Sequence, residues 1–121
     1  MGIVKIDHVQ LAMPRGGEDR AREFYGRLLE IPEVQKRGAL VQRGGVWFQR
    51  DDVKVDLGVE VEFRAALKAH PAFLVRDLEE LVQRLRTAGV EVIDDGLLPG
   101  YRRVHVTDPF GNRLELMERK E

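Results

Sequence analysis

The sequence contains no cysteine and a single tryptophan among its 121 residues. Without cysteine, the chain cannot form a disulfide, a thiolate nucleophile or a cysteine-ligated zinc site. Its formal net charge is −1, with acidic and basic residues interspersed. This balance gives no electrostatic basis for binding nucleic acid or an anionic membrane. Any metal site would therefore be built from histidine and oxygen ligands rather than from cysteine.

Long hydrophobic runs are also absent. No apolar segment approaches the length that crosses a membrane, and the start MGIVKIDHV is typical of a strand rather than of a signal peptide. We therefore expect a cytoplasmic protein with no membrane partner and no nucleic-acid partner. The hydrophobic content of 43% and charged content of 34% are typical of a globular domain. The length predicts one domain, residues 1–121, or two very small modules that share a core.

The first half of the chain predicts a strand, a helix and three further strands. Residues 3–13 are rich in β-branched residues and alternate in part, which indicates a strand. A helix is predicted from about Glu18 to the residues before Pro32, with one apolar face formed by Ala21, Phe24, Tyr25, Leu28 and Leu29. Strands are then predicted at Ala39 to Arg43, Val46 to Arg50 and Val53 to Val59, separated by turns at Gly44-Gly45 and Asp51-Asp52.

The second half repeats this order. A strand at residues 70–75 precedes a helix at residues 77–88, with Asp77 as N-cap and Gly89 at its C-terminal end. Strands follow at residues 90–93, 102–107 and 113–118, with a turn at Asp108-Pro109-Phe110-Gly111. The chain therefore predicts an α+β fold of two tandem βαβββ modules, residues 3–60 and 70–118, joined by residues 61–69.

Each module has a histidine just before an apolar run of its first strand, VQLAM after His8 and PAFLV after His70, and an acid in its last strand. His8 is followed by Asp56, and His70 is followed by Glu115. Two histidines and two carboxylates form a suitable donor set for a divalent metal of borderline softness. A histidine at a strand start is more often a half-buried polar residue, so a metal-free pocket that keeps these side chains is the alternative.

Strand alternation places these four residues on the sheet face that points away from the helices. Leu114 and Leu116 would pack under a helix, which turns Glu115 to the opposite face. Tyr101, Arg103 and His105 fall on the same side as Glu115. Arg103 and Tyr101 could bind an anionic substrate group and His105 could shuttle a proton, or all three could be solvated rim residues. Trp47 is predicted to line the pocket or the core.

Four segments resemble the vicinal oxygen chelate superfamily, which includes glyoxalase I, bleomycin-resistance proteins, extradiol dioxygenases and fosfomycin-resistance enzymes. The segments are DHVQLAM, REFYGRLLEI, HPAFLV and DPFGNRLELME. The resemblance implies that the two modules form a curved mixed sheet with helices on the outside. It implies a divalent metal ion, such as Ni, Zn, Mn, Co or Fe, with His8, His70 and Glu115 at the commonest ligand positions. Asp56 matches the fourth position, which is glutamate in glyoxalase I.

The resemblance further implies a homodimer in which His8 and Asp56 of one chain meet His70 and Glu115 of the other. It favours a metal-dependent lyase or isomerase, dioxygenase or thiol transferase that acts on a small oxygen-chelating substrate. The ion would act as a Lewis acid that stabilises an oxyanion, and Glu115 or Asp56 would be the catalytic base. The alternative is metal-free sequestration, as in bleomycin-resistance proteins, although 7% aromatic content disfavours a large flat drug site. A dimeric relative without activity is a third interpretation.

Overall fold

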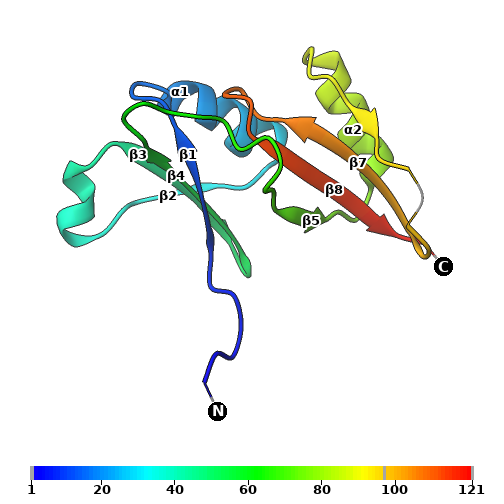
Figure 1. The fold of residues 1–121 in the computed structure, drawn as a ribbon, viewed down its shortest axis with the longest axis horizontal. Coiled ribbons are helices and arrows are strands. Elements are labelled where there is room, and N and C mark those ends of the chain that lie inside the picture. The colour runs from blue at the N-terminus through cyan, green and yellow to red at the C-terminus, as the bar shows by residue number, and fades with distance from the viewer. Residues whose placement is uncertain (1, 97, 121) are drawn as a thin grey trace. The chain divides into compact units, whose positions relative to one another are not determined.

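The computed structural model describes residues 2–96 and 98–120 and divides into two compact units. Unit 1 is Met1–Arg64 and unit 2 is Ala65–Glu121. Each unit contains a strand, a helical segment and three further strands, in that order (Figure 1). The predicted α+β class and the duplicated βαβββ order are therefore confirmed.

Unit 1 contains a four-stranded mixed sheet in the order β1-β4-β3-β2. β1 is parallel to β4, and the other neighbouring strands are antiparallel. The elements are β1 (Val9–Met13), α1 (Glu18–Ala21), the π-helix η1 (Arg22–Leu28), β2 (Glu33–Val34), the 3-10 helix η2 (Gly38–Gln42), β3 (Gly45–Arg50) and β4 (Val53–Val59).

Two predicted strands of unit 1 are wrong in whole or in part. Ala39 to Arg43 was predicted as a strand but falls mostly in η2, where backbone bonds span three residues and Arg43 N donates to Leu40 O at 3.1 Å. The edge strand is β2 instead. The first strand begins at Val9 rather than Ile3, because Val9 already lies opposite Val55, near the start of β4. Residues 2–8 precede the paired part of the strand and extend away from β1 (Figure 1).

The helical segment of unit 1 covers one face of its sheet with the predicted apolar residues, except that Leu29 is only half-buried. Its second part is widened to a π-helix, and Leu29 N donates to Phe24 O at 2.9 Å. Phe24, Tyr25 and Leu28 are buried, and the Tyr25 ring stacks on Phe48 with centroids 5.6 Å apart. This packing assigns Val46, Phe48, Val55 and Leu57 to the helix-facing side of the sheet.

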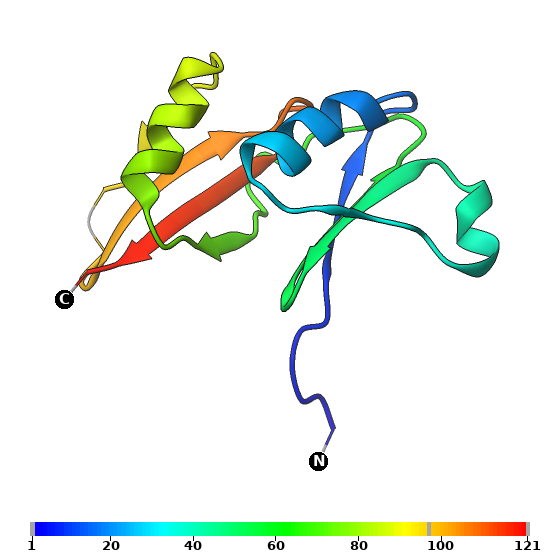
Figure 2. The same ribbon diagram turned by 180° about the vertical axis from the view of Figure 1, so that it is seen from behind.

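Unit 2 has the same strand arrangement, β5-β8-β7-β6, with β5 parallel to β8. Its elements are β5 (Ala72–Leu74), α2 (Leu78–Thr87), β6 (Ile93–Asp94), β7 (Tyr101–Thr107) and β8 (Arg113–Arg119). Figure 2 shows α2 lying against this sheet. The buried residues of this layer are Leu78, Leu81, Val82, Leu85, Val104, Val106, Leu114 and Leu116. The predicted helix-facing positions of β7 and β8 are thus confirmed.

The predicted ends of α2 and the predicted β7–β8 turn are also confirmed. The Asp77 carboxylate accepts from Glu80 N at 3.3 Å, and Gly89 follows the helix with φ of +86°. In the turn, Gly111 N donates to Asp108 O at 3.0 Å, and Asp108 Oδ1 accepts from two backbone N–H groups. None of the helices in the described residues is long and apolar enough to span a membrane.

Candidate functional site

Asp56 lies at the centre of a polar row on the helix-free face of unit 1. Its register partners are Gln10 on β1 and Trp47 on β3. Directly paired residues in a sheet point to the same face, so Gln10, Asp56 and Trp47 lie side by side. The neighbouring residues Val55 and Leu57 are buried on the opposite, helix-facing side. The strand parity expected from the sequence therefore holds around Asp56.

The Asp56 carboxylate is almost fully buried, with 4% of the residue exposed. Gln49 Nε2 donates a hydrogen bond to its Oδ1 at 3.2 Å. Burial raises the pKa of Asp56, while the Gln49 hydrogen bond and the nearby His8 lower it to a smaller extent. A buried carboxylate whose hydrogen-bond donor is a neutral amide is stabilised by binding a proton or a cation.

His8 lies immediately before β1, with its side chain about half exposed. Its Nδ1 donates to Asp7 Oδ2 at 3.0 Å, since a carboxylate only accepts. This bond and Lys54 hold the pKa of Asp7 below its usual range. With its proton on Nδ1, a neutral His8 ring presents the lone pair of Nε2 as a ligand.

His70 has the same local arrangement in unit 2. Its Nδ1 donates to the backbone carbonyl of Lys68 at 2.7 Å, which again leaves the lone pair on Nε2 of the neutral ring. This Nε2 lies 3.0 Å from Glu115 Oε1. Two atoms with lone pairs at this distance require a proton or a cation between them. The pair is therefore suited to share a positively charged species.

Glu115 is buried, with 6% of the residue exposed, at the middle of β8. Its second oxygen, Oε2, accepts from Arg103 Nη1 at 3.4 Å. His105 on β7 is its direct cross-strand partner, so both side chains lie on the helix-free face of unit 2. The structure thus brings His70, Glu115, Arg103 and His105 together within one unit.

The residues present fit a divalent metal ion. Metal-binding histidines commonly donate their second ring N–H to a carboxylate or backbone carbonyl, as both His8 and His70 do here. Two donors bound at about 2.1 Å to one ion can lie about 3 Å apart, which matches His70 and Glu115. Over residues 2–96 and 98–120, no three such side chains cluster as a metal site. Each unit by itself supplies one predicted histidine ligand and one predicted acidic ligand.

The predicted substrate-binding residues occupy different places. Arg103 and His105 lie beside Glu115, as described above. Tyr101 is the first residue of β7 and lies opposite Arg119, whose Nη2 donates to the Tyr101 hydroxyl at 3.4 Å. In unit 1, Trp47 lines a cavity of about 390 Å³ together with Gln10 and Gly58.

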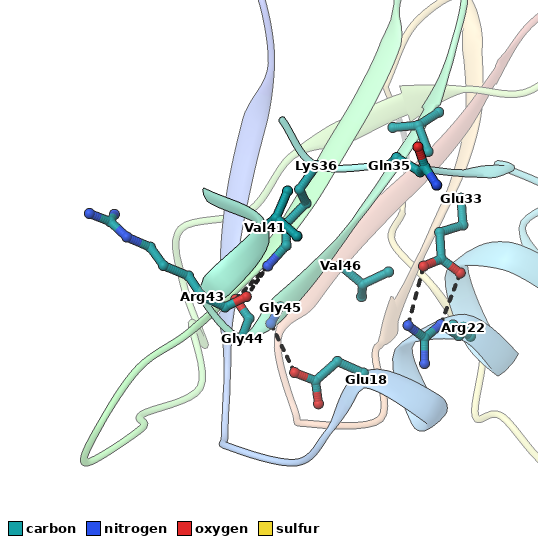
Figure 3. A pocket seen from close by; sticks show the side chains of 11 residues that line it. Glu18, Arg22, Glu33, Gln35, Lys36, Val41, Arg43, Gly44, Gly45 and Val46 are labelled. Carbon is teal, nitrogen blue, oxygen red and sulfur yellow. Dashed lines mark hydrogen bonds and ion pairs between the residues drawn. The ribbon is translucent and has the colours of Figure 1, made fainter. Parts of the chain in front are cut away.

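A second cavity of unit 1, of about 470 Å³, lies beside the helical segment and includes Val46 from the helix-facing side of β3 (Figure 3). Four of its charged side chains, Glu18, Arg22, Glu33 and Lys36, are engaged with each other or with the backbone. Arg22 pairs with Glu33 at 2.9 Å, and Glu18 accepts from Gly45 N at 2.8 Å, which lowers the pKa of Glu18. Lys36 donates to the carbonyls of Arg43 and Gly44. These contacts fix the start of β3.

Four supporting residues were not predicted. The position of Asp7 next to His8 was the one signal in the sequence. Lys68 accepts from His70 through its backbone carbonyl, and Gln49 donates to Asp56 from the neighbouring strand. The sequence pattern reveals neither contact. Asp95, just after β6, lies 3.9 Å from Arg103, 3.8 Å from Arg113 and 3.6 Å from His105. Its turn-like surroundings gave no indication of this role.

Comparison with known proteins identifies the family. Residues 5–116 match the family model of the Glyoxalase/Bleomycin resistance protein/Dioxygenase superfamily. A crystal structure of a glyoxalase family protein from Bacillus anthracis has 47% identity and a TM-score of 0.93, covering 98% of this chain and 97% of that chain. No protein in a search of curated sequences matches the chain.

Two more distant structures share the fold. A glyoxalase/dioxygenase from Nostoc punctiforme has 20% identity and a TM-score of 0.79, covering 97% of this chain and 92% of its own. The fosfomycin resistance protein FosX from Listeria monocytogenes has 17% identity and a TM-score of 0.74, covering 96% and 93%. With the family match over nearly the whole length, the chain belongs to the Glyoxalase/Bleomycin resistance protein/Dioxygenase superfamily.

Proposed function

We propose that the protein is a divalent-metal-dependent enzyme that acts on a small substrate through two neighbouring substrate oxygens. The proposed ligands are His8, His70, Glu115 and Asp56. The observation that carries the proposal is the arrangement of the two histidines. Each has its Nδ1 proton held by a local acceptor and its Nε2 lone pair left as a donor.

Two further features support a metal at these residues. Both acids are buried, and a buried ionised carboxylate is strongly unfavourable unless a cation or hydrogen-bond donors compensate it. Neutral imidazole with carboxylate is also the donor set that nickel, zinc, manganese, cobalt and iron accept. Members of this superfamily commonly use divalent metals.

A bound divalent ion would supply Lewis acidity toward a substrate oxygen. Protein side chains would act as the base, hold the ion and orient the substrate. Asp56 is the favoured base, because its carboxylate is held by a hydrogen bond from the neutral Gln49 amide rather than by an arginine. Glu115 is engaged at both oxygens, by His70 and Arg103, which suits a fixed ligand. Arg103 and His105 would orient the substrate beside it. The reaction class is a proton transfer or an addition at a carbon next to the bound oxygens.

We further propose that the protein forms a homodimer in which two chains contribute ligands to one ion. Residues 2–8 support an oligomer, because Ile3, Val4 and Ile6 are strongly exposed in the single chain. Apolar residues that are exposed close together commonly mark a contact surface. Size-exclusion chromatography with light scattering measures this directly, and a monomer at micromolar concentration would contradict it.

The metal assignment is tested by metal analysis of the purified protein. We expect about one equivalent of a first-row divalent ion per proposed site, and we expect His70→Ala to lose it in calorimetric titration. His105→Ala is the matched control, because it removes a histidine of the same sheet face that is not a proposed ligand. Equal loss in both variants would contradict the ligand assignment. A protein that contains no metal and binds none, but is stabilised by aromatic drugs, would instead be a sequestration protein.

A further inference from the structure

Asp95 is surrounded by three nitrogen donors from the two central strands of unit 2. Arg103 and His105 lie on β7, and Arg113 lies at the start of β8. The Oδ2 of Asp95 lies 3.9 Å from Arg103 Nη1 and 3.8 Å from Arg113 Nη2, and its Oδ1 lies 3.6 Å from His105 Nδ1. One carboxylate therefore faces three donors at once.

None of these distances reaches a normal charge-assisted hydrogen bond, which is about 2.7–2.9 Å long. Within the described residues, Arg103 Nε, Arg113 Nε and His105 Nδ1 are buried atoms with no hydrogen-bond partner. Buried donors without an acceptor are uncommon in folded proteins and need an explanation. The Asp95 carboxylate thus faces all three donors at 3.6–3.9 Å, beyond hydrogen-bond distance, and leaves them unsatisfied.

We propose that Arg103, Arg113 and His105 form a binding site for a tetrahedral oxyanion and that Asp95 occupies this site until the ligand displaces it. Inorganic phosphate has four oxygens and a phosphonate has three, arranged tetrahedrally around phosphorus, whereas a carboxylate has two in a plane. The larger group can reach donors on several sides, including the unpaired Nε–H of an arginine. His105 donates from Nδ1 in the corresponding tautomer.

The position of Asp95 allows this exchange. Its side chain is about one-fifth exposed, at the end of β6, so a path to solvent exists. Its backbone N–H donates to the Arg103 carbonyl at 3.2 Å, which holds the main chain in place while the side chain rotates. Glu115 also contacts Arg103, so departure of Asp95 leaves two guanidinium groups opposed by one buried carboxylate. The ligand anion then replaces the lost negative charge.

This inference extends the proposed function by naming the anionic group of the substrate, and it rests on the assignment of Arg103 to substrate binding. Its test is independent of the metal. We would titrate the full chain, treated with EDTA, with inorganic phosphate in a calorimeter at low chloride concentration. Asp95→Asn should bind phosphate at least about tenfold tighter than the wild type, because the site is no longer occupied by an internal anion.

The matched control is Asp94→Asn, which makes the same charge change at an exposed neighbouring residue. It should leave phosphate affinity within about twofold of the wild type, and Arg113→Gln added to Asp95→Asn should abolish the gain. Asp95→Ser serves the same purpose if the asparagine variant does not fold. Unchanged or weaker phosphate binding without the Asp95 charge would overturn the proposal, since Asp95 would then only support the arginines. An equal gain for acetate would overturn the tetrahedral assignment.

Discussion

Replacing Gly45 with alanine should destabilise the protein more strongly than the same change at Gly16. Both residues have positive φ, +110° at Gly45 and +83° at Gly16. A Cβ at Gly45 would lie 2.3 Å from the Leu57 carbonyl oxygen on β4, whereas a Cβ at Gly16 would meet no atom within 4 Å. The comparison separates the backbone clash from the conformational strain that both variants share.

The magnitudes follow from these two terms. Left-handed backbone costs an alanine about 1–2 kcal/mol, and the loss of glycine entropy in the unfolded chain returns about 0.4–1 kcal/mol. Gly16→Ala should therefore cost less than about 1.5 kcal/mol. At Gly45 the strand must also move, which adds about 1–3 kcal/mol and gives a total of about 2–4 kcal/mol. With an unfolding entropy of about 0.25 kcal/mol/K for this length, Tm should fall by about 8–16 °C.

Urea denaturation of both variants measures the difference in unfolding free energy directly. A change at Gly45 also reaches the candidate site, because the same strand carries Trp47 and Gln49 toward Asp56. If the two variants lie within about 1 kcal/mol of each other, then the close approach of β3 to β4 at Gly45 does not limit stability, and the reasoning is refuted.

Three other outcomes are expected. Asp56→Asn should make the metal-free protein more stable at pH 7 while weakening metal binding. Because burial raises the pKa of Asp56 in the folded state, its ionisation disfavours folding as pH rises above 3.8. The gain in unfolding free energy, measured by chemical denaturation, should therefore vanish near pH 3. A gain that does not depend on pH would argue against this cause. Free nickel or zinc at 100 times its Kd should raise the melting temperature by about 10 °C, equivalent to about 2.7 kcal/mol. The melting temperature of His70→Ala should not change, and the same shift in that variant would place the ion elsewhere. Asp77→Ala should lower the unfolding free energy by about 1 kcal/mol through loss of the α2 cap, whereas Asp94→Ala, which caps no helix, should change it by less than about 0.5 kcal/mol.

The sequence was most informative where a long periodic pattern matched one face of an element. The apolar stripes of both helices and the alternation of β7 and β8 predicted most of the buried apolar side chains, because burial of one face is what stabilises such elements. Leu29 of the first stripe is only half-buried. It failed for short segments. Ala39 to Arg43 contains residues that favour strands, yet Gly38 with φ of +59° and the local bonds of η2 turn the chain instead.

The candidate site was predictable only in part. Asp56 and Glu115 were assigned correctly to the helix-free faces, because strand parity is local. The contacts that hold them were not predictable. Gln49 reaches Asp56 by cross-strand register, and Asp95 reaches three donors from a segment without a periodic pattern. Such convergence depends on register and turn geometry, which a single sequence does not specify.

The two histidines depend on acceptors of different chemical origin, and this difference bears on how the protein tolerates genetic change. His70 is held by the main-chain carbonyl of Lys68, which persists whatever side chain occurs at position 68. His8 is held by the side chain of Asp7, which a single codon change removes. Natural variants should therefore lose ring orientation at His8 more readily than at His70, and deep mutational scanning should find position 7 restricted to acceptor side chains while position 68 varies freely.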